Sequence, residues 1–170
     1  QTTTIAATID STGVPAGSYK YTWSVADAIS TTIKVRISSV ADDTVKDLSN
    51  NVFKIRGAFT LETPNGGEKW AVNSQQSVTW AKSGNMTSAK LDLSTNGGSS
   101  YTIPIVGATP AGGLTYLWTL PDNISTTCKV KISDAGDATV YDVSNAAFTI
   151  MGAFVISQPN GSDVWIVNNQ

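Results

Sequence analysis

The sequence has no histidine and a single cysteine, and each shortage excludes a class of chemistry. Histidine is the commonest general base and the commonest transition-metal ligand, so its absence removes the usual centre of such sites. Cys128 has no second cysteine with which to form a disulfide and no histidine to activate it as a nucleophile. We therefore expect Cys128 to be a buried, inert thiol, and we expect the protein not to be an enzyme.

Charge and long hydrophobic runs are scarce as well. Charged residues make up 14% of the 170 residues and the formal net charge is −2, so the surface offers nucleic acid no basic footprint. No window approaches the 18 apolar residues of a membrane span, which predicts no membrane insertion. The polar residues are instead mostly hydroxyl-bearing, because 19 Ser and 22 Thr form about a quarter of the chain. This composition, poor in cysteine, favours an extracellular or cell-surface location.

The strongest signal in the sequence is an internal repeat. Residues 21–75 align without a gap on residues 116–170 at a constant offset of 95, and 29 of the 55 pairs are identical. The Pro64-Asn-Gly66 turn, for example, recurs as Pro159-Asn-Gly161. A period of 95 is the size of an immunoglobulin-like β-sandwich rather than of a short solenoid repeat.

This period divides the sequence into three parts. Residues 58–152 are expected to form one complete repeat, residues 1–57 the C-terminal part of a preceding repeat, and residues 153–170 the start of a following one. We therefore expect the sequence to be a segment of a longer tandem array, made semi-rigid by short junctions. Residues 153–170 and 1–57 together lack counterparts of residues 76–95, which include Trp80, and this argues against a complete strand exchange between copies.

Alternation of apolar and polar residues predicts strands within each repeat. Leu91 and Leu93, for example, flank Asp92, and Asn96-Gly-Gly98 follows as a hairpin signal. About seven strands with turns between them predict an all-β, antiparallel sandwich. The expected strands lie around residues 59–61, 70–72, 77–80, 89–93, 101–105, 116–118, 128–132 and 148–150.

Three segments carry a family resemblance: Pro64-Asn-Gly-Gly-Glu-Lys-Trp70, Val78-Thr-Trp80 and Leu91-Asp-Leu-Ser-Thr-Asn-Gly-Gly98. They are similar to repeats of bacterial and archaeal secreted proteins, and to the Ser-Thr-rich glycosylphosphatidylinositol-anchored membrane family related to the yeast cell-wall synthesis domain. The resemblance implies an immunoglobulin-like or fibronectin-type-III-like sandwich in surface layers, filaments, adhesins or secreted hydrolases, and it implies no catalytic residues. One departure is that Gly67 becomes Ser162 in the next copy.

A group of aspartates is the candidate metal site. Asp134, Asp137 and Asp142 supply the oxygen ligands that Ca²⁺ prefers, although their spacing does not match an EF-hand loop. Aspartate also serves turns by accepting hydrogen bonds from its own backbone. Calcium binding and turn formation therefore both stand as interpretations, and the sequence implies no other cofactor.

Two further groups of residues suggest contact with sugars. Asn85, Asn123 and Asn160 each begin an Asn-X-Ser/Thr sequon, so each is a candidate glycosylation site, although such motifs also arise by chance in a chain rich in Asn, Ser and Thr. The five tryptophans, which are Trp23, Trp70, Trp80, Trp118 and Trp165, lie in strand-like runs. A sandwich core routinely buries such residues, whereas an exposed pair would favour carbohydrate binding.

We therefore expect a structural role. The sequence predicts a tandem-repeat segment of an extracellular cell-surface, surface-layer or filament protein, which acts as a scaffold that packs against other copies of itself or neighbouring repeats. Sparse charge leaves little repulsion between such surfaces. The alternative is an adhesin or a carbohydrate-binding accessory module of a larger secreted protein, with cell-surface carbohydrate as its partner.

Overall fold

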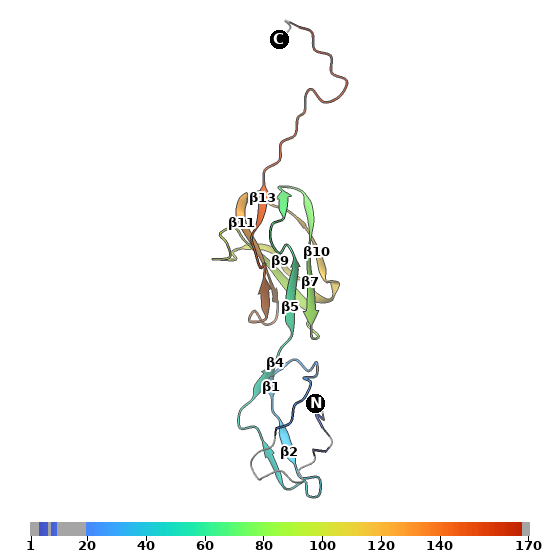
Figure 1. The fold of residues 1–170 in the computed structure, drawn as a ribbon, viewed down its shortest axis with the longest axis vertical. Coiled ribbons are helices and arrows are strands. Elements are labelled where there is room, and N and C mark those ends of the chain that lie inside the picture. The colour runs from blue at the N-terminus through green and yellow to red at the C-terminus, as the bar shows by residue number, and fades with distance from the viewer. Residues whose placement is uncertain (1–3, 7, 10–19, 168–170) are drawn as a thin grey trace. The chain divides into compact units, whose positions relative to one another are not determined.

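The computed structural model describes residues 4–6, 8–9 and 20–167, and within them the protein is all-β, with thirteen strands and one short 3-10 helix. The chain forms two compact units. The first runs to Gly57 and includes Ser83–Asn85, and the second comprises Ala58–Lys82 and the residues from Met86 onward (Figure 1). Among the described residues, no helix has the length and apolar character needed to cross a membrane.

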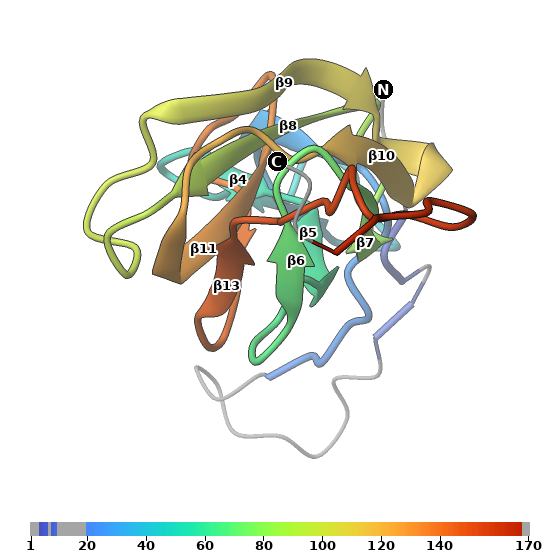
Figure 2. The ribbon, with the colours of Figure 1, turned by 90° about the horizontal axis from the view of Figure 1, so that it is seen from above.

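The larger sheet of the second unit has the strand order β6-β13-β11-β8-β9, with β12 paired to one end of β11 (Figure 2). Neighbours are antiparallel except β6 and β13, which pair in parallel with Trp70 opposite Ile150. The strands are β6 (Lys69–Ala71), β8 (Ser88–Ser94), β9 (Ile103–Pro110), β11 (Ser125–Asp134), β12 (Tyr141–Val143) and β13 (Phe148–Met151).

A second sheet in the same unit has the order β10-β7-β5. Its strands are β5 (Ala58–Thr63), β7 (Gln75–Ser83) and β10 (Thr115–Thr119), and the 3-10 helix Ala111–Gly113 precedes β10. Strand β5 alternates between exposed and buried side chains, as a period-2 strand with one apolar face requires, whereas Leu91–Ser94 of β8 are buried throughout.

The buried faces of the two sheets join in one hydrophobic core. Trp80 is fully buried there, and its Nε1–H donates a hydrogen bond to the backbone oxygen of Ala111 at 3.0 Å, so the indole leaves no unpaired polar atom. The core is built from Phe59, Leu61, Trp70, Val78, Trp80, Met86, Ala89, Leu91, Leu93, Ala111, Trp118, Leu120, Cys128, Val130, Ile132, Val140, Phe148 and Ile150.

The first unit holds two antiparallel strand pairs. Strand β1 (Ser30–Ile33) pairs with β4 (Phe53–Ile55), and β2 (Arg36–Ser38) pairs with β3 (Lys46–Leu48). The register is that of the second unit shifted by 95 residues. Ser30 faces Ile55 as Ser125 faces Ile150.

The same shift holds for the second strand pair. Ile37 faces Asp47 in the first unit as Ile132 faces Asp142 in the second. The two remaining partners of β2 and β3 follow the same rule, since Arg36–Leu48 and Ser38–Lys46 correspond to Lys131–Val143 and Ser133–Tyr141. Residues at equal positions of the repeat therefore form the same ladder.

The first unit differs in the continuity of its central strand. The run that forms the single strand β11 in the second unit is divided into β1 and β2 in the first, with Lys34 and Val35 between them. In the second unit β11 is held along Lys129–Asp134 by β8. Among its described residues, the first unit has no strand in the place of β8.

Most of the predicted strands are confirmed in the second unit, including those around residues 59–61, 89–93, 128–132 and 148–150. The hairpin signal Asn96-Gly-Gly98 lies between β8 and β9, and both glycines have positive φ. The short strand β12 was not predicted, because Tyr141–Val143 is too brief to show an alternation.

Candidate interaction surfaces

The aspartates proposed as calcium ligands are engaged in turns. Asp134 Oδ1 accepts a hydrogen bond from the N–H of Gly136 at 2.9 Å. Asp137 Oδ1 accepts bonds from the N–H of Thr139 at 3.1 Å and from its hydroxyl. These bonds close the loop between β11 and β12, as expected of aspartate in tight turns.

Asp142, the third candidate, lies on β12 and is turned toward a neighbouring strand. Its Oδ2 accepts a hydrogen bond from the N–H of Leu61 on β5 at 2.7 Å. In the part of the chain that the structure describes, no three His, Cys, Asp or Glu side chains are grouped so that they could hold a metal ion. Calcium binding by Asp134, Asp137 and Asp142 stays a prediction, and Asp142 has a clear role in joining the two sheets.

The same turn chemistry recurs in the first unit. Asp42 Oδ1 accepts hydrogen bonds from Thr44, at 2.6 Å from the hydroxyl and 2.9 Å from the backbone N–H. These bonds favour the carboxylate form, the hydroxyl bond most strongly, and they lower the pKa of Asp42 below its ordinary value. The turn is thus a repeated structural element of both units.

All three candidate glycosylation sites lie outside strands. Asn85 and Asn160 are exposed and Asn123 is half-buried. An attached glycan needs a side chain that reaches solvent, so Asn85 and Asn160 have the more suitable positions. Glycosylation itself stays a prediction.

Cys128 is fully buried on β11, as predicted. Burial raises the pKa of its thiol, and hydrogen bonds with the backbone of Ile150 and with Ser125 offset this only in part. A raised thiol pKa keeps the sulfur protonated and unreactive.

The prediction that the tryptophans lie in the core is confirmed for the second unit, where Trp70, Trp80 and Trp118 are buried. Trp70 lies at the centre of an aromatic cluster, with its ring centroid 5.2 Å from that of Phe148 and 6.3 Å from that of Trp118. Trp165, the counterpart of Trp70, differs because its side chain is 70% exposed.

A cation–aromatic group that was not predicted from the sequence lies on the outer face of the larger sheet. Lys131 Nζ lies 4.4 Å from the centroid of the Tyr141 ring and 6.0 Å from that of Tyr101. Burial, with a smaller contribution from Tyr141, raises the pKa of Tyr101. The residues 95 positions earlier are Arg36, Lys46 and Ala6, so this group belongs to one repeat and not to both.

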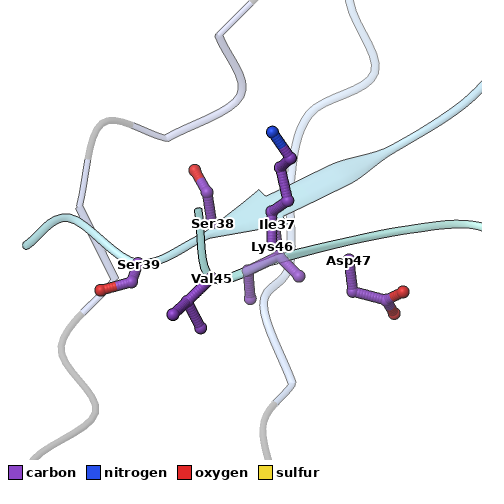
Figure 3. A pocket seen from close by; sticks show the side chains of 6 residues that line it. All are labelled: Ile37, Ser38, Ser39, Val45, Lys46 and Asp47. Atoms are coloured by element: carbon purple, nitrogen blue, oxygen red, sulfur yellow. The ribbon is translucent and has the colours of Figure 1, made fainter. Parts of the chain in front are cut away.

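The first unit exposes a pocket along β2 and β3. The described residues that line it are Ile37, Ser38, Ser39, Val45, Lys46 and Asp47 (Figure 3). Their counterparts in the second unit lie on β11 and β12 or in the loop between them, where β5 packs against both strands. The pocket therefore marks the place that β5 occupies in the second unit.

Residues 153–167 form a second exposed apolar surface. They form no strand, and seven of their apolar side chains are exposed: Phe154, Val155, Ile156, Val164, Trp165, Ile166 and Val167. An exposed run of this kind is unusual for a monomeric soluble protein and indicates an interaction surface.

Comparison with known proteins gives no assignment of either surface. No protein-family model matches the chain. A search of curated proteins also finds no match. The resemblance carried by Pro64–Trp70 and the two other segments therefore stays a prediction.

Proposed function

We propose that the protein is a structural segment of an extracellular surface protein, a surface layer or a filament. In this proposal each unit is an immunoglobulin-like or fibronectin-type-III-like β-sandwich, or part of one, repeated with a period of 95 residues. The chain acts as a semi-rigid scaffold whose units pack against other copies or neighbouring repeats.

One observation carries this proposal, namely the register that the two units share. The residue pairs between β1 and β4 recur 95 residues later between β11 and β13. Those between β2 and β3 recur in the same way between β11 and β12. A repeat whose backbone ladder is reproduced position by position suits a modular scaffold.

Surface labelling of the source cells tests the extracellular scaffold. Antibodies raised against the 170-residue chain should decorate intact cells densely in electron micrographs, and a protease added to intact cells should remove the label. Labelling that appears only after the cells are permeabilised would contradict the proposal.

The alternative is an adhesin or carbohydrate-binding module, and the group formed by Lys131, Tyr101 and Tyr141 favours it. Aromatic rings beside a cation offer stacking and hydrogen bonding at once, and the Tyr141 side chain is 55% exposed. Incubating the chain with a glycan array tests this function. Binding to defined glycans that is lost in Tyr141→Ala would favour the adhesin, whereas no binding to any glycan would remove this alternative.

A further inference from the structure

Residues 153–167 repeat the segment that completes the core of the second unit. Their three key apolar residues, Phe154, Ile156 and Trp165, correspond at the 95-residue offset to residues that are buried in the second unit, namely Phe59, Leu61 and Trp70. Phe154 is fully exposed and the other two are 70% exposed, so the same side-chain pattern is present but, among the described residues, no surface covers it.

The second unit shows how such a segment is held. Strand β6 adds to the larger sheet in parallel to β13, and Trp70 faces Ile150. Strand β5 is fixed by the bond from the N–H of Leu61 to Asp142. Apolar burial and backbone pairing thus act together along 58–72.

The turn between β5 and β6 is held by a second set of polar contacts. Ser144 Oγ donates to the backbone oxygen of Pro64 at 2.8 Å. The N–H of Asn145 donates to Asn65 Oδ1 at 2.6 Å. The N–H of Gly67 donates to the backbone oxygen of Ala147 at 2.9 Å. These contacts place the turn of 64–67 against the residues between β12 and β13.

The first unit carries the same anchoring residues. Asp142, Ser144 and Asn145 correspond to Asp47, Ser49 and Asn50, which are identical in type. Ser49 Oγ accepts a bond from the N–H of Val35 at 3.2 Å, just as Ser144 Oγ accepts one from Val130 at 3.0 Å. Asp47 lines the pocket at the place that corresponds to β5 (Figure 3).

The exposed segment already has the turn that this site requires. The N–H of Asn160 donates to Asp163 Oδ2 at 2.6 Å, as the N–H of Asn65 donates to Glu68 Oε1 at 2.7 Å in the second unit. A segment with its turn formed loses less conformational freedom on binding.

We propose that residues 153–167 of one copy dock on the first unit of a second copy. The segment around Trp165 adds in parallel to β4, with Trp165 facing Ile55, and the N–H of Ile156 donates to Asp47. This is addition of a strand to an exposed sheet edge. Because donor and acceptor surfaces differ, the contact is head-to-tail and generates chains or rings. The proposal rests on the self-packing scaffold proposed above and names the surface that performs it.

The docked segment supplies the counterparts of β5 and β6 and leaves those of β7 and β8 unfilled. The predicted contact is therefore a partial complementation, reversible and dependent on concentration.

A matched pair of variants distinguishes docking in a defined register from nonspecific apolar association. Trp165→Ser removes the side chain that enters the core site. Val164→Lys removes a neighbouring apolar side chain whose counterpart, Lys69, is exposed in the second unit. Sedimentation velocity over a range of concentrations should show association of the full chain that is at least about thirtyfold weaker in Trp165→Ser and changed by less than about threefold in Val164→Lys. Equal weakening by both variants would overturn the proposal, because it would mean that the segment associates through apolar surface without register.

A mixing experiment tests the head-to-tail geometry. Asp47→Lys removes the exposed anchor on the first unit but keeps the C-terminal segment, whereas Trp165→Ser does the reverse. Each variant alone should be largely monomeric at a concentration at which the unmodified chain associates, and an equimolar mixture should form a 1:1 dimer through the two intact surfaces. A mixture that remains monomeric, or single variants that associate like the unmodified chain, would overturn the proposal.

These outcomes are separable from those of the proposed function. Dense surface label together with a chain that is monomeric at all concentrations would overturn docking and leave the extracellular scaffold standing. Intracellular label together with the 1:1 dimer would do the opposite.

Discussion

The two units place the same residues in the same ladders but bury them to different extents. Ile132 is fully buried, whereas Ile37, its counterpart, is 62% exposed. Val140 is 7% exposed and Val45 is 61% exposed. Strand pairing in the first unit therefore does not depend on a closed core, because local ladders form where their residues alternate correctly. Closure of the core depends on the second sheet, which the second unit obtains from β5, β7 and β10.

The largest expected contrast concerns the phenylalanine at the same position in both units. Phe148→Ala removes a fully buried ring that contacts Trp70, so it should lower the free energy of unfolding of the second unit by about 3–5 kcal/mol. Phe53→Ala truncates a half-buried ring and should cost the chain about 1 kcal/mol or less. Urea denaturation of the full chain, followed by tryptophan fluorescence, measures both. Equal losses would break the comparison, because they would mean that the first unit also has a closed core.

The sequence alone could not predict most of this difference in burial between the two units. The alternation in residues 89–93 and 128–132 was sufficient to predict β8 and β11, because buried strands impose period 2 on their own residues. The same alternation in residues 33–37 could not show that the strand divides at Lys34 and Val35, because the continuity of a strand depends on its neighbours in the sheet and not on its own residues alone.

The candidate interaction surfaces could also be predicted only in part from the sequence. The sequence left Asp142 as either a calcium ligand or a turn residue, but its bond with Leu61 spans 81 residues and has no local signal. Trp165 matched a core tryptophan in sequence, and its exposure follows from the absence of a partner surface around it. The pairing of Lys131 with Tyr141 depends on the register of β11 and β12, which the brief β12 did not reveal.

A smaller contrast is expected between Asp142, which joins the two sheets, and its exposed counterpart Asp47. Asp142→Ala leaves the N–H of buried Leu61 without its acceptor, so it should lower the free energy of unfolding by about 1.5–3 kcal/mol. Asp47→Ala removes an exposed side chain and should change the stability of the dilute, monomeric chain by less than about 0.5 kcal/mol. Parallel urea titrations at low concentration check this pair. A large effect of Asp47→Ala under those conditions would show that Asp47 already has a structural role within its own copy.

The smallest effect concerns the turn that both units share. Thr44→Val removes the hydroxyl that donates to Asp42, so the pKa of Asp42 should rise toward its ordinary value, as an NMR titration of the carboxyl would show. Because the folded-state pKa is lowered, the turn contributes stability above the unfolded-state pKa and loses it as the pH falls through the folded-state value. The difference in stability between the unmodified chain and Thr44→Val should therefore be present at neutral pH and disappear at strongly acidic pH. An unchanged pKa of Asp42 in the variant would mean that the hydroxyl bond does not determine it.

Amide hydrogen exchange of the full chain at low and high concentration tests the central claim most directly. The account predicts that amides of β11 and β13 are protected equally at both concentrations. Amides of β3, of β4 and of residues 153–167 should gain protection only at high concentration, when the segment of one copy covers the first unit of another. Protection of these amides that is the same at both concentrations would contradict the account.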